Sequence, residues 1–130
     1  MSEAKIPIEF KLFGVGELKG VFLRHLSPIC ADALLRKMPF VLRGRFHFGS
    51  KDFWILPGLG IKKGVNQKAK KDTEKGDIFY NPKSDELIII LEAKQMQNKM
   101  NKLGEITSNL DILKEARNGL SMKISKKEVK

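Results

Sequence analysis

The chain has 130 residues, of which 42% are hydrophobic and 31% are charged, and its formal net charge is +10. This length and composition predict a single domain, residues 1–130, and exclude a disordered chain, a collagen-like repeat and a disulfide-stapled miniprotein. The longest aliphatic run, Leu87–Leu91, is far shorter than the roughly 20 residues of a membrane-spanning helix. Charged residues stand where an export signal has its apolar stretch, and the single cysteine, Cys30, cannot form an internal disulfide. We therefore expect a cytoplasmic protein without a membrane partner.

The N-terminal part of the chain is predicted to form a β-hairpin followed by a helix. Residues 6–23 alternate apolar and polar side chains around two glycines, which is typical of a hairpin. Ser27-Pro28 is a typical helix start and Met38-Pro39 a typical helix end, so a helix is expected over residues 28–38. The apolar face of this helix should contain Ile29, Cys30, Ala33, Leu34 and Met38.

The middle of the chain is predicted to form four strands. In residues 40–48, alternate side chains fall on two faces, and one of these faces carries Val41, Arg43, Arg45 and His47. Further strands are expected at 53–56, 77–80 and 86–92, the last two as a hairpin. Because Leu87–Leu91 is unbroken by polar residues, both faces of that strand should be covered.

The remaining segments give weaker signals. Residues 62–75 have almost no apolar residues and are predicted to be a long mobile loop, whereas 93–103 are ambiguous between helix and irregular structure. A second helix is expected over 108–118, a final strand over 120–124 and a frayed tail over 126–130. About seven strands with two short α-helices predict a mainly β fold, a closed β-barrel with helices over its ends.

The positive charge is concentrated in the predicted loop, where six lysines and two acidic residues fall within residues 62–75. These lysines are the candidate polyanion site: Lys62, Lys63, Lys68, Lys70, Lys71 and Lys75. Lysine outnumbers arginine twenty to five in the whole chain, and the loop has no aromatic residue on which a base could stack. Nucleic-acid binding through this loop should therefore be weak and independent of sequence.

No pattern in the chain predicts catalytic residues, a metal site or a cofactor. The paired glycines at 14 and 16 and at 58 and 60 lack the further residues of a dinucleotide or Walker loop. Two histidines and one cysteine are too few for a typical metal-ligand set, and no nucleophile elbow is present.

One face of the predicted strand 40–48 is a candidate ligand groove. Arg43, Arg45 and His47 occupy alternate positions, each about 6.6–7 Å from the next, and could bind a carboxylate, a phosphate or a peptide carbonyl. The single tryptophan and the single tyrosine, Trp54 and Tyr80, complete this candidate groove, although such residues are more often core or rim residues.

Four segments also follow one another in the same order as the motifs of a known protein family. They are Ser27–Ala31 with Met38-Pro39, Phe48-Gly49 with Phe53–Pro57, Glu74–Pro82, and Asn101–Ile106. The first is similar to the family's first helix, and the others to its WG.E.YF..P, GD..YWP and N..G.I motifs. The chain thereby resembles, over residues 6–125, the small cyclophilin-like domain proteins of bacteria and archaea, which are largely of unknown function. Phe48 and Asn81 replace tryptophans of these relatives, and the loop 62–75 is unusually basic.

The resemblance implies a cyclophilin-like β-barrel but not an active prolyl isomerase. In true cyclophilins an arginine on a barrel strand polarises the peptide beside an apolar pocket for proline. The run from Arg45 to Phe48 is superficially similar to that strand, but the glutamine-bearing segment that should follow is absent. Three hypotheses result: a non-catalytic module that binds a peptide or small molecule, a peptidyl-prolyl isomerase, and a weak polyanion binder.

Overall fold

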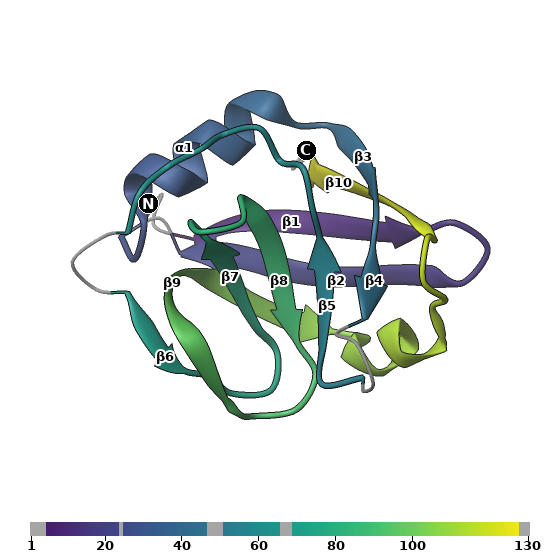
Figure 1. Cartoon of the computed structure of the whole chain (residues 1–130). Coiled ribbons are helices and arrows are strands. Elements are labelled where there is room, and N and C mark those ends of the chain that lie inside the picture. The colour runs from purple at the N-terminus through teal and green to yellow at the C-terminus, as the bar shows by residue number, and fades with distance from the viewer. Residues whose placement is uncertain (1–4, 24, 47–50, 66–68, 128–130) are drawn as a thin grey trace.

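A computed structural model describes residues 5–23, 25–46, 51–65 and 69–127. The described chain contains ten strands, one α-helix and one 3₁₀ helix, which are labelled in Figure 1 where there is room. In chain order these are β1 (Lys5–Leu12), β2 (Gly16–Leu23), α1 (Pro28–Lys37), β3 (Phe40–Arg43), β4 (Arg45–Phe46), β5 (Phe53–Leu56), β6 (Lys70–Asp72), β7 (Asp77–Asn81), β8 (Glu86–Ile90), β9 (Gln95–Ser108), η1 (Leu110–Glu115) and β10 (Ser121–Lys126). The mainly β prediction is therefore confirmed.

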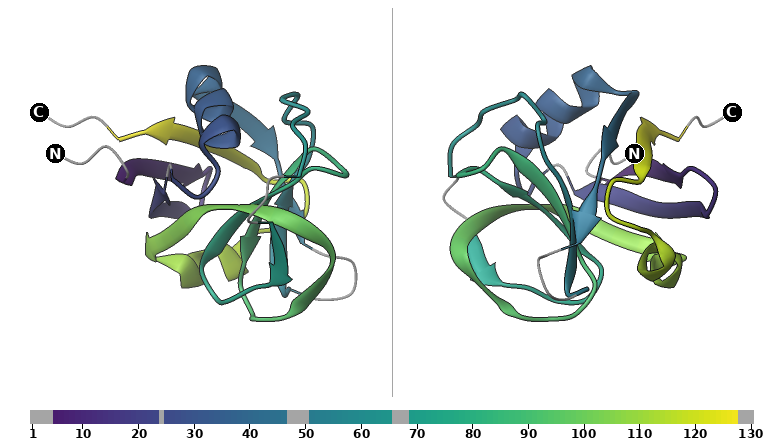
Figure 2. Two further views of the ribbon diagram at one scale, coloured as in Figure 1. Left: turned by 90° about the vertical axis from the view of Figure 1, so that its left-hand side faces the viewer. Right: turned by 45° about the vertical axis from the view of Figure 1, so that its right-hand side comes forward.

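The strands form one antiparallel sheet in the order β3-β10-β1-β2-β9-β7-β8-β5-β4, with β6 added beside β9. The predicted hairpins over 6–23 and 77–92 are confirmed as β1–β2 and β7–β8. The sheet is strongly coiled, so that β1 and β2 pass behind β5 and β8, and α1 lies above them (Figures 1 and 2). The hydrogen-bonded path does not close into a ring, because β3 and β4 are its two edges.

A large apolar core fills the space that the coiled sheet and α1 enclose. It joins Phe10 and Phe22 of the first hairpin to Trp54 and Leu34, all of them with exposed fractions of 0%. A second, smaller cluster includes Phe53, Ile55, Phe79, Ile88, Ile90 and Met100. Alternate residues of β8 belong to the two clusters, which confirms that both faces of this strand are covered.

Helix α1 begins and ends close to the predicted positions, at Pro28 and Lys37. Its buried side chains are Cys30, Ala31 and Leu34, whereas Ile29 is 68% exposed. The prediction that Ile29 belongs to the buried face is therefore wrong, because residues 30, 31 and 34 follow the 3.6-residue period and turn Ile29 outward.

Three predicted segments differ from the structure. Residues 70–72 of the predicted loop form β6, which pairs with β9. The ambiguous residues 93–103 mostly belong to the 14-residue strand β9. The predicted α-helix over 108–118 is the 3₁₀ helix η1, and its N-cap, Asn109, has a left-handed backbone and makes no side-chain capping bond. Leu110, Leu113 and Ala116 recur every three residues, which is the period of a 3₁₀ helix.

Among the residues that the structure describes, no helix is long and apolar enough to cross a membrane.

Gly44 connects the two edge strands of the sheet, β3 and β4. A Cβ atom at this position would overlap two ring carbons of Trp54, closer than any van der Waals contact allows. The N–H of Gly44 donates to the carbonyl of Leu120 over 2.9 Å, and its own carbonyl accepts from Gly119 over 2.7 Å. The backbone at Gly44 is therefore held on one side by residues 119–120 and on the other by the indole ring.

Replacing Gly44 by alanine should destabilise the fold, because either the Trp54 ring or the backbone must move. We expect Gly44→Ala to lower the free energy of unfolding by about 1–3 kcal/mol, the usual cost of overpacking a core. Urea unfolding followed by tryptophan fluorescence measures this loss. Gly64→Ala is the matched control, because a Cβ there meets no atom within 4 Å, and it should change stability by less than about 0.5 kcal/mol. Equal stability of the two variants would contradict the steric argument.

Candidate functional site

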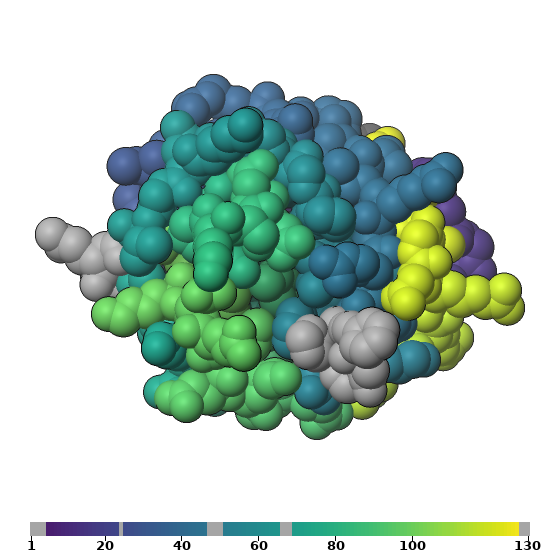
Figure 3. Space-filling model, in the orientation of Figure 1, coloured from purple at the N-terminus to yellow at the C-terminus, as the bar shows by residue number. Residues whose placement is uncertain are grey.

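A pocket of about 570 Å³ opens beside the first turn of α1. One wall is the start of the helix, another is the segment 62–65, and Asn101 of β9 forms part of the floor. The lining residues are His25, Leu26, Ser27, Pro28, Ile29, Cys30, Lys62, Lys63, Gly64, Val65 and Asn101. In Figures 1 and 3 the segment that follows β5 runs along α1, so residues distant in sequence share one surface. The volume lies within the range of about 300–1,000 Å³ that is usual for small-molecule sites.

The carboxylate of Asp85 fixes the segment 60–62, which leads into the wall formed by residues 62–65. Its two oxygens accept the backbone N–H groups of Gly60 over 2.6 Å and Lys62 over 2.8 Å. Gly60 and Lys62 both have positive φ angles, 79° and 48°, and this turns successive amide groups toward one anion. The side chain of Leu59 is fully buried in the large core and anchors the chain just before this segment.

Tyr80 forms the second part of this arrangement. Its hydroxyl donates to Asp85 over 2.6 Å and accepts the backbone N–H of Lys63 over 3.1 Å. Burial, together with the hydrogen bond to Asp85, raises the pKa of Tyr80 to about 12, so the phenol stays a neutral donor. Burial by itself raises the pKa of Asp85, but the hydrogen bonds from Tyr80 and from the amides of residues 60–62 outweigh it and lower the pKa.

Asn101 joins the floor of the pocket to both walls. Its side-chain N–H group donates to the carbonyl of Gly64 over 2.9 Å and to the sulfur of Cys30 over 3.3 Å. Asn101 is 0% exposed and Cys30 is 3% exposed. Burial raises the pKa of the Cys30 thiol more than the Asn101 hydrogen bond and the charge of Lys63 lower it. The thiol is therefore neutral at physiological pH and adds no negative charge to the pocket.

The rim of the pocket combines exposed apolar side chains with positive charge. Ile29 and Val65 are 68% and 59% exposed, the highest values among the large hydrophobic residues that the structure describes. Lys62 and Lys63 stand beside them in the lining. Among the described residues no acidic side chain lines the pocket.

The residues of the predicted groove are not brought together around this pocket. Arg43 lies exposed at the end of β3, and the guanidinium of Arg45 lies 3.7 Å from the carboxylate of Glu86. Trp54 and Tyr80 are both 0% exposed, so neither side chain reaches the surface in this structure. Both belong to the large core, because their strands are covered on both faces. His47 lies outside the described residues.

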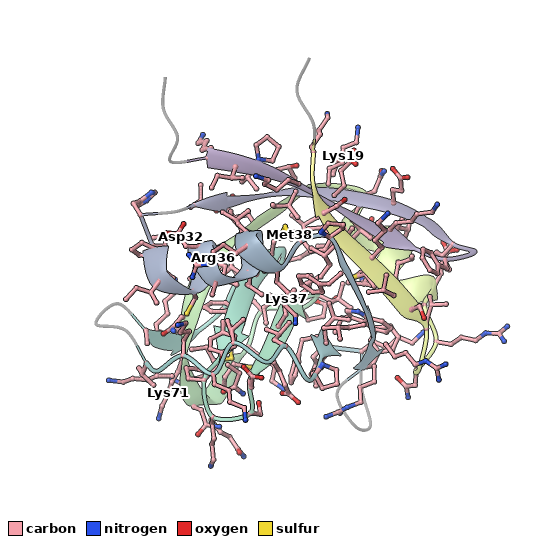
Figure 4. The ribbon with its side chains drawn as sticks, turned by 90° about the horizontal axis from the view of Figure 1, so that it is seen from above. Lys19, Asp32, Arg36, Lys37, Met38 and Lys71 are labelled. Atoms are coloured by element: carbon pink, nitrogen blue, oxygen red, sulfur yellow. The ribbon has the colours of Figure 1, made fainter. Side chains whose placement is uncertain are left out.

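The lysines of the predicted polyanion site are also dispersed. Lys62 and Lys63 line the pocket, Lys70 and Lys71 lie on β6, and Lys75 lies 3.8 Å from Asp111. Lys71 points outward from the protein, away from α1 (Figure 4). Lys68 lies outside the described residues.

Within the described ranges, no cluster of three histidine, cysteine or carboxylate side chains is suited to hold a metal ion.

Sequence reasoning missed Asn101, Asp85 and Cys30 as parts of a site. Asp85 could have been noticed, because it precedes a buried strand and follows Asn81-Pro82, a typical turn start. Asn101 and Cys30 are 71 positions apart, and no local pattern links them.

Comparisons with known proteins support the fold. No family model matches the chain, and no curated protein sequence matches it. A hypothetical protein of Archaeoglobus fulgidus, AF2241, is similar in structure with a TM-score of 0.77 and 14% identity, over 98% of this chain and 100% of that one. The structure of McbB in complex with tryptophan is similar with a TM-score of 0.76 and 13% identity, over 95% of this chain but only 45% of McbB. At such identities the likeness shows a shared fold.

Replacing Asp85 by asparagine should loosen the wall of the pocket. Asparagine keeps the left-handed backbone of this position, where φ is 57°, but removes the charge that the amides bind. We expect Asp85→Asn to lower the free energy of unfolding at pH 7 by roughly 1–2 kcal/mol and to speed amide exchange at Gly60 and Lys62. Because folding lowers the pKa of Asp85, its carboxylate stabilises the protein above the unfolded pKa of about 4. That contribution disappears as the pH falls through the lower folded pKa.

Urea unfolding at pH 7 and pH 3, with hydrogen exchange at pH 7, measures both effects. The difference between wild type and Asp85→Asn should be smaller at pH 3. Asp111→Asn is the control, because its side chain is 82% exposed in a 3.8 Å ion pair, and it should change stability by less than about 1 kcal/mol. An Asp85→Asn variant as stable as wild type at pH 7, with unchanged exchange, would show that the carboxylate does not hold the wall.

Proposed function

We propose that this protein is a non-catalytic binding module that holds a small molecule with an apolar body in the pocket beside α1. The observation that carries the proposal is the position of Ile29 and Val65. These two side chains are the most exposed large hydrophobic residues among those described, and both line one pocket. Exposed apolar side chains that converge on a concave site are typical of ligand recognition, because a ligand that covers them removes apolar surface from water.

The walls of this pocket support the proposal, since they are fixed before any ligand arrives. Asp85 and Tyr80 hold the segment 60–63, and Asn101 ties Gly64 to the floor. A preformed site loses less conformational entropy on binding than a loop that must first be ordered. The McbB structure contains tryptophan, an amino acid with an apolar body, which makes indole compounds reasonable first probes.

We further propose that the sheet is a barrel of the cyclophilin-like type. The support is that the two edge strands, β3 and β4, are consecutive in the chain. Gly44 alone separates them, so the backbone itself links the two ends of the hydrogen-bonded path. The isomerase and polyanion hypotheses receive less support. Arg45 pairs with Glu86 beside buried Trp54, and the loop lysines that the structure describes occupy several separate places.

Titration with indole tests the proposed function. We expect dissociation constants in the millimolar range or tighter, with NMR amide shifts concentrated at Cys30, Gly64 and Asn101. Val65→Trp should fill the mouth of the pocket and weaken binding about tenfold, which corresponds to about 1.4 kcal/mol. Val41→Trp is the matched control, because Val41 is a 47% exposed valine on β3 outside this pocket, and it should bind indole like wild type. Shifts spread elsewhere, or equal effects of the two tryptophan variants, would contradict the proposal.

A further inference from the structure

We infer that the ligand of this pocket is a small organic anion, whose apolar body packs on Ile29 and Val65 and whose carboxylate or phosphate binds Lys62 and Lys63. The inference deepens the proposed function and rests on it. It adds a charge requirement to an apolar site, and this requirement can be tested separately from binding itself.

The first argument is the balance of charge in the lining. Two of the eleven described lining residues are lysines, and no described lining residue is acidic. Several lysines in other parts of the described chain are paired with carboxylates. Lys94 lies 3.3 Å from Asp52, Lys102 lies 3.2 Å from Asp77, and Lys114 lies 3.3 Å from Glu92. The pocket therefore concentrates positive charge without an acidic side chain of its own to neutralise it, and such a site attracts anions.

The second argument is the state of two groups beside the lysines that could have supplied negative charge. The carboxylate of Asp85 is not in the lining, and its oxygens are occupied by the hydroxyl of Tyr80 and the amides of Gly60 and Lys62. The thiol of Cys30 is buried in the pocket wall, and burial raises its pKa more than the hydrogen bond from Asn101 lowers it, so the thiol stays neutral. Neither group competes with a ligand for Lys62 and Lys63.

The third argument is the backbone of Lys62. Its φ of 48° lies in the left-handed region, which glycine and asparagine adopt more easily than residues with long side chains. This conformation directs the Lys62 amide to Asp85 while the side chain contributes to the pocket lining. The hydrogen bond from the Lys62 amide to Asp85 therefore holds the backbone of the wall and also fixes where the Lys62 side chain begins at the rim.

The fourth argument is the depth at which the lining groups lie. The most deeply buried ones are Asn101 of the floor, at 0% exposure, and Cys30 of the helix wall, at 3%, whereas the exposed apolar residues stand at the mouth. Lys62 is exposed and Lys63 is half-buried, so their charges remain near solvent. A ligand that matches this arrangement inserts an apolar body and leaves one anionic group at the rim. A volume of about 570 Å³ suits a small molecule rather than a polymer.

Four probes with the same indole body test the charge requirement: indole, indole-3-acetamide, indole-3-acetate and indoxyl phosphate. We expect the two anions to bind wild type about tenfold more tightly than the amide at low ionic strength, and the preference to shrink as salt is added. The affinities of indole-3-acetate and indoxyl phosphate, compared with each other, show whether the pocket prefers a carboxylate or a phosphate. The measurements are calorimetric and NMR titrations of the full chain.

The variant Lys62→Asn/Lys63→Gln removes both rim charges, and asparagine retains the left-handed backbone at position 62. This variant should bind the anions and the amide equally. Lys70→Gln/Lys71→Gln is the matched control, because it removes the same charge from β6 outside the lining, and it should keep the preference of wild type.

The outcomes separate the inference from the proposed function. If indole and the amide bind as well as the anions and Val65→Trp weakens all four, the pocket is a ligand site and the anion inference is wrong. If the preference for anions is lost equally in both lysine variants, it reflects overall charge, and the inference is again wrong. If no probe binds in the millimolar range, the proposed function and the inference both fail.

Discussion

The two edges of the sheet are held together by a single residue without a side chain, Gly44. The chain leaves β3, which pairs with β10, and enters β4, which pairs with β5, within one residue. Because Gly44 has no Cβ atom, the Trp54 ring packs directly against this part of the backbone. The coiling of the sheet brings β9 beneath α1, and the pocket between them exists only because of that coiling.

The pocket adds a second layer of constraint to this frame. The carboxylate of Asp85 accepts hydrogen bonds from the backbone of residues 60–62, a segment that belongs to no helix or strand. The neutral hydroxyl of Tyr80 extends the same network to Lys63. Hydrogen bonds to a charged acceptor are among the stronger ones in proteins, so a few of them can order a segment of mixed glycine and lysine. The same hydrogen bonds fix the backbone from which Lys62 and Lys63 project into the pocket lining.

Local patterns were informative where one face of an element is apolar and the other polar. The alternation in β1, β2 and β3 and the helix signals at Pro28 and Met38 translated directly into structure. In β9 the same alternation is present, since Met96 and Met100 point toward the second cluster and Gln95, Gln97 and Lys99 are exposed. The sequence does not identify this strand, because methionine, glutamine and asparagine have little preference for strands. The predicted α-helix over 108–118 differs from the structure because Leu110, Leu113 and Ala116 recur every three residues, which fits a 3₁₀ helix better.

The sequence by itself determined a mainly β domain, its hairpins, its first helix and the surplus of lysine in residues 62–75. Only the tertiary structure decided which side chains form a site. Trp54 and Tyr80 are of residue types that often contact ligands, but both are buried because their strands are covered on both faces. Cys30, Lys62 and Asn101 come from a helix, a connecting segment and a strand, and they line one pocket because the coiled sheet brings those elements together. Contacts across such distances depend on how the whole sheet bends, and no local pattern records that bend.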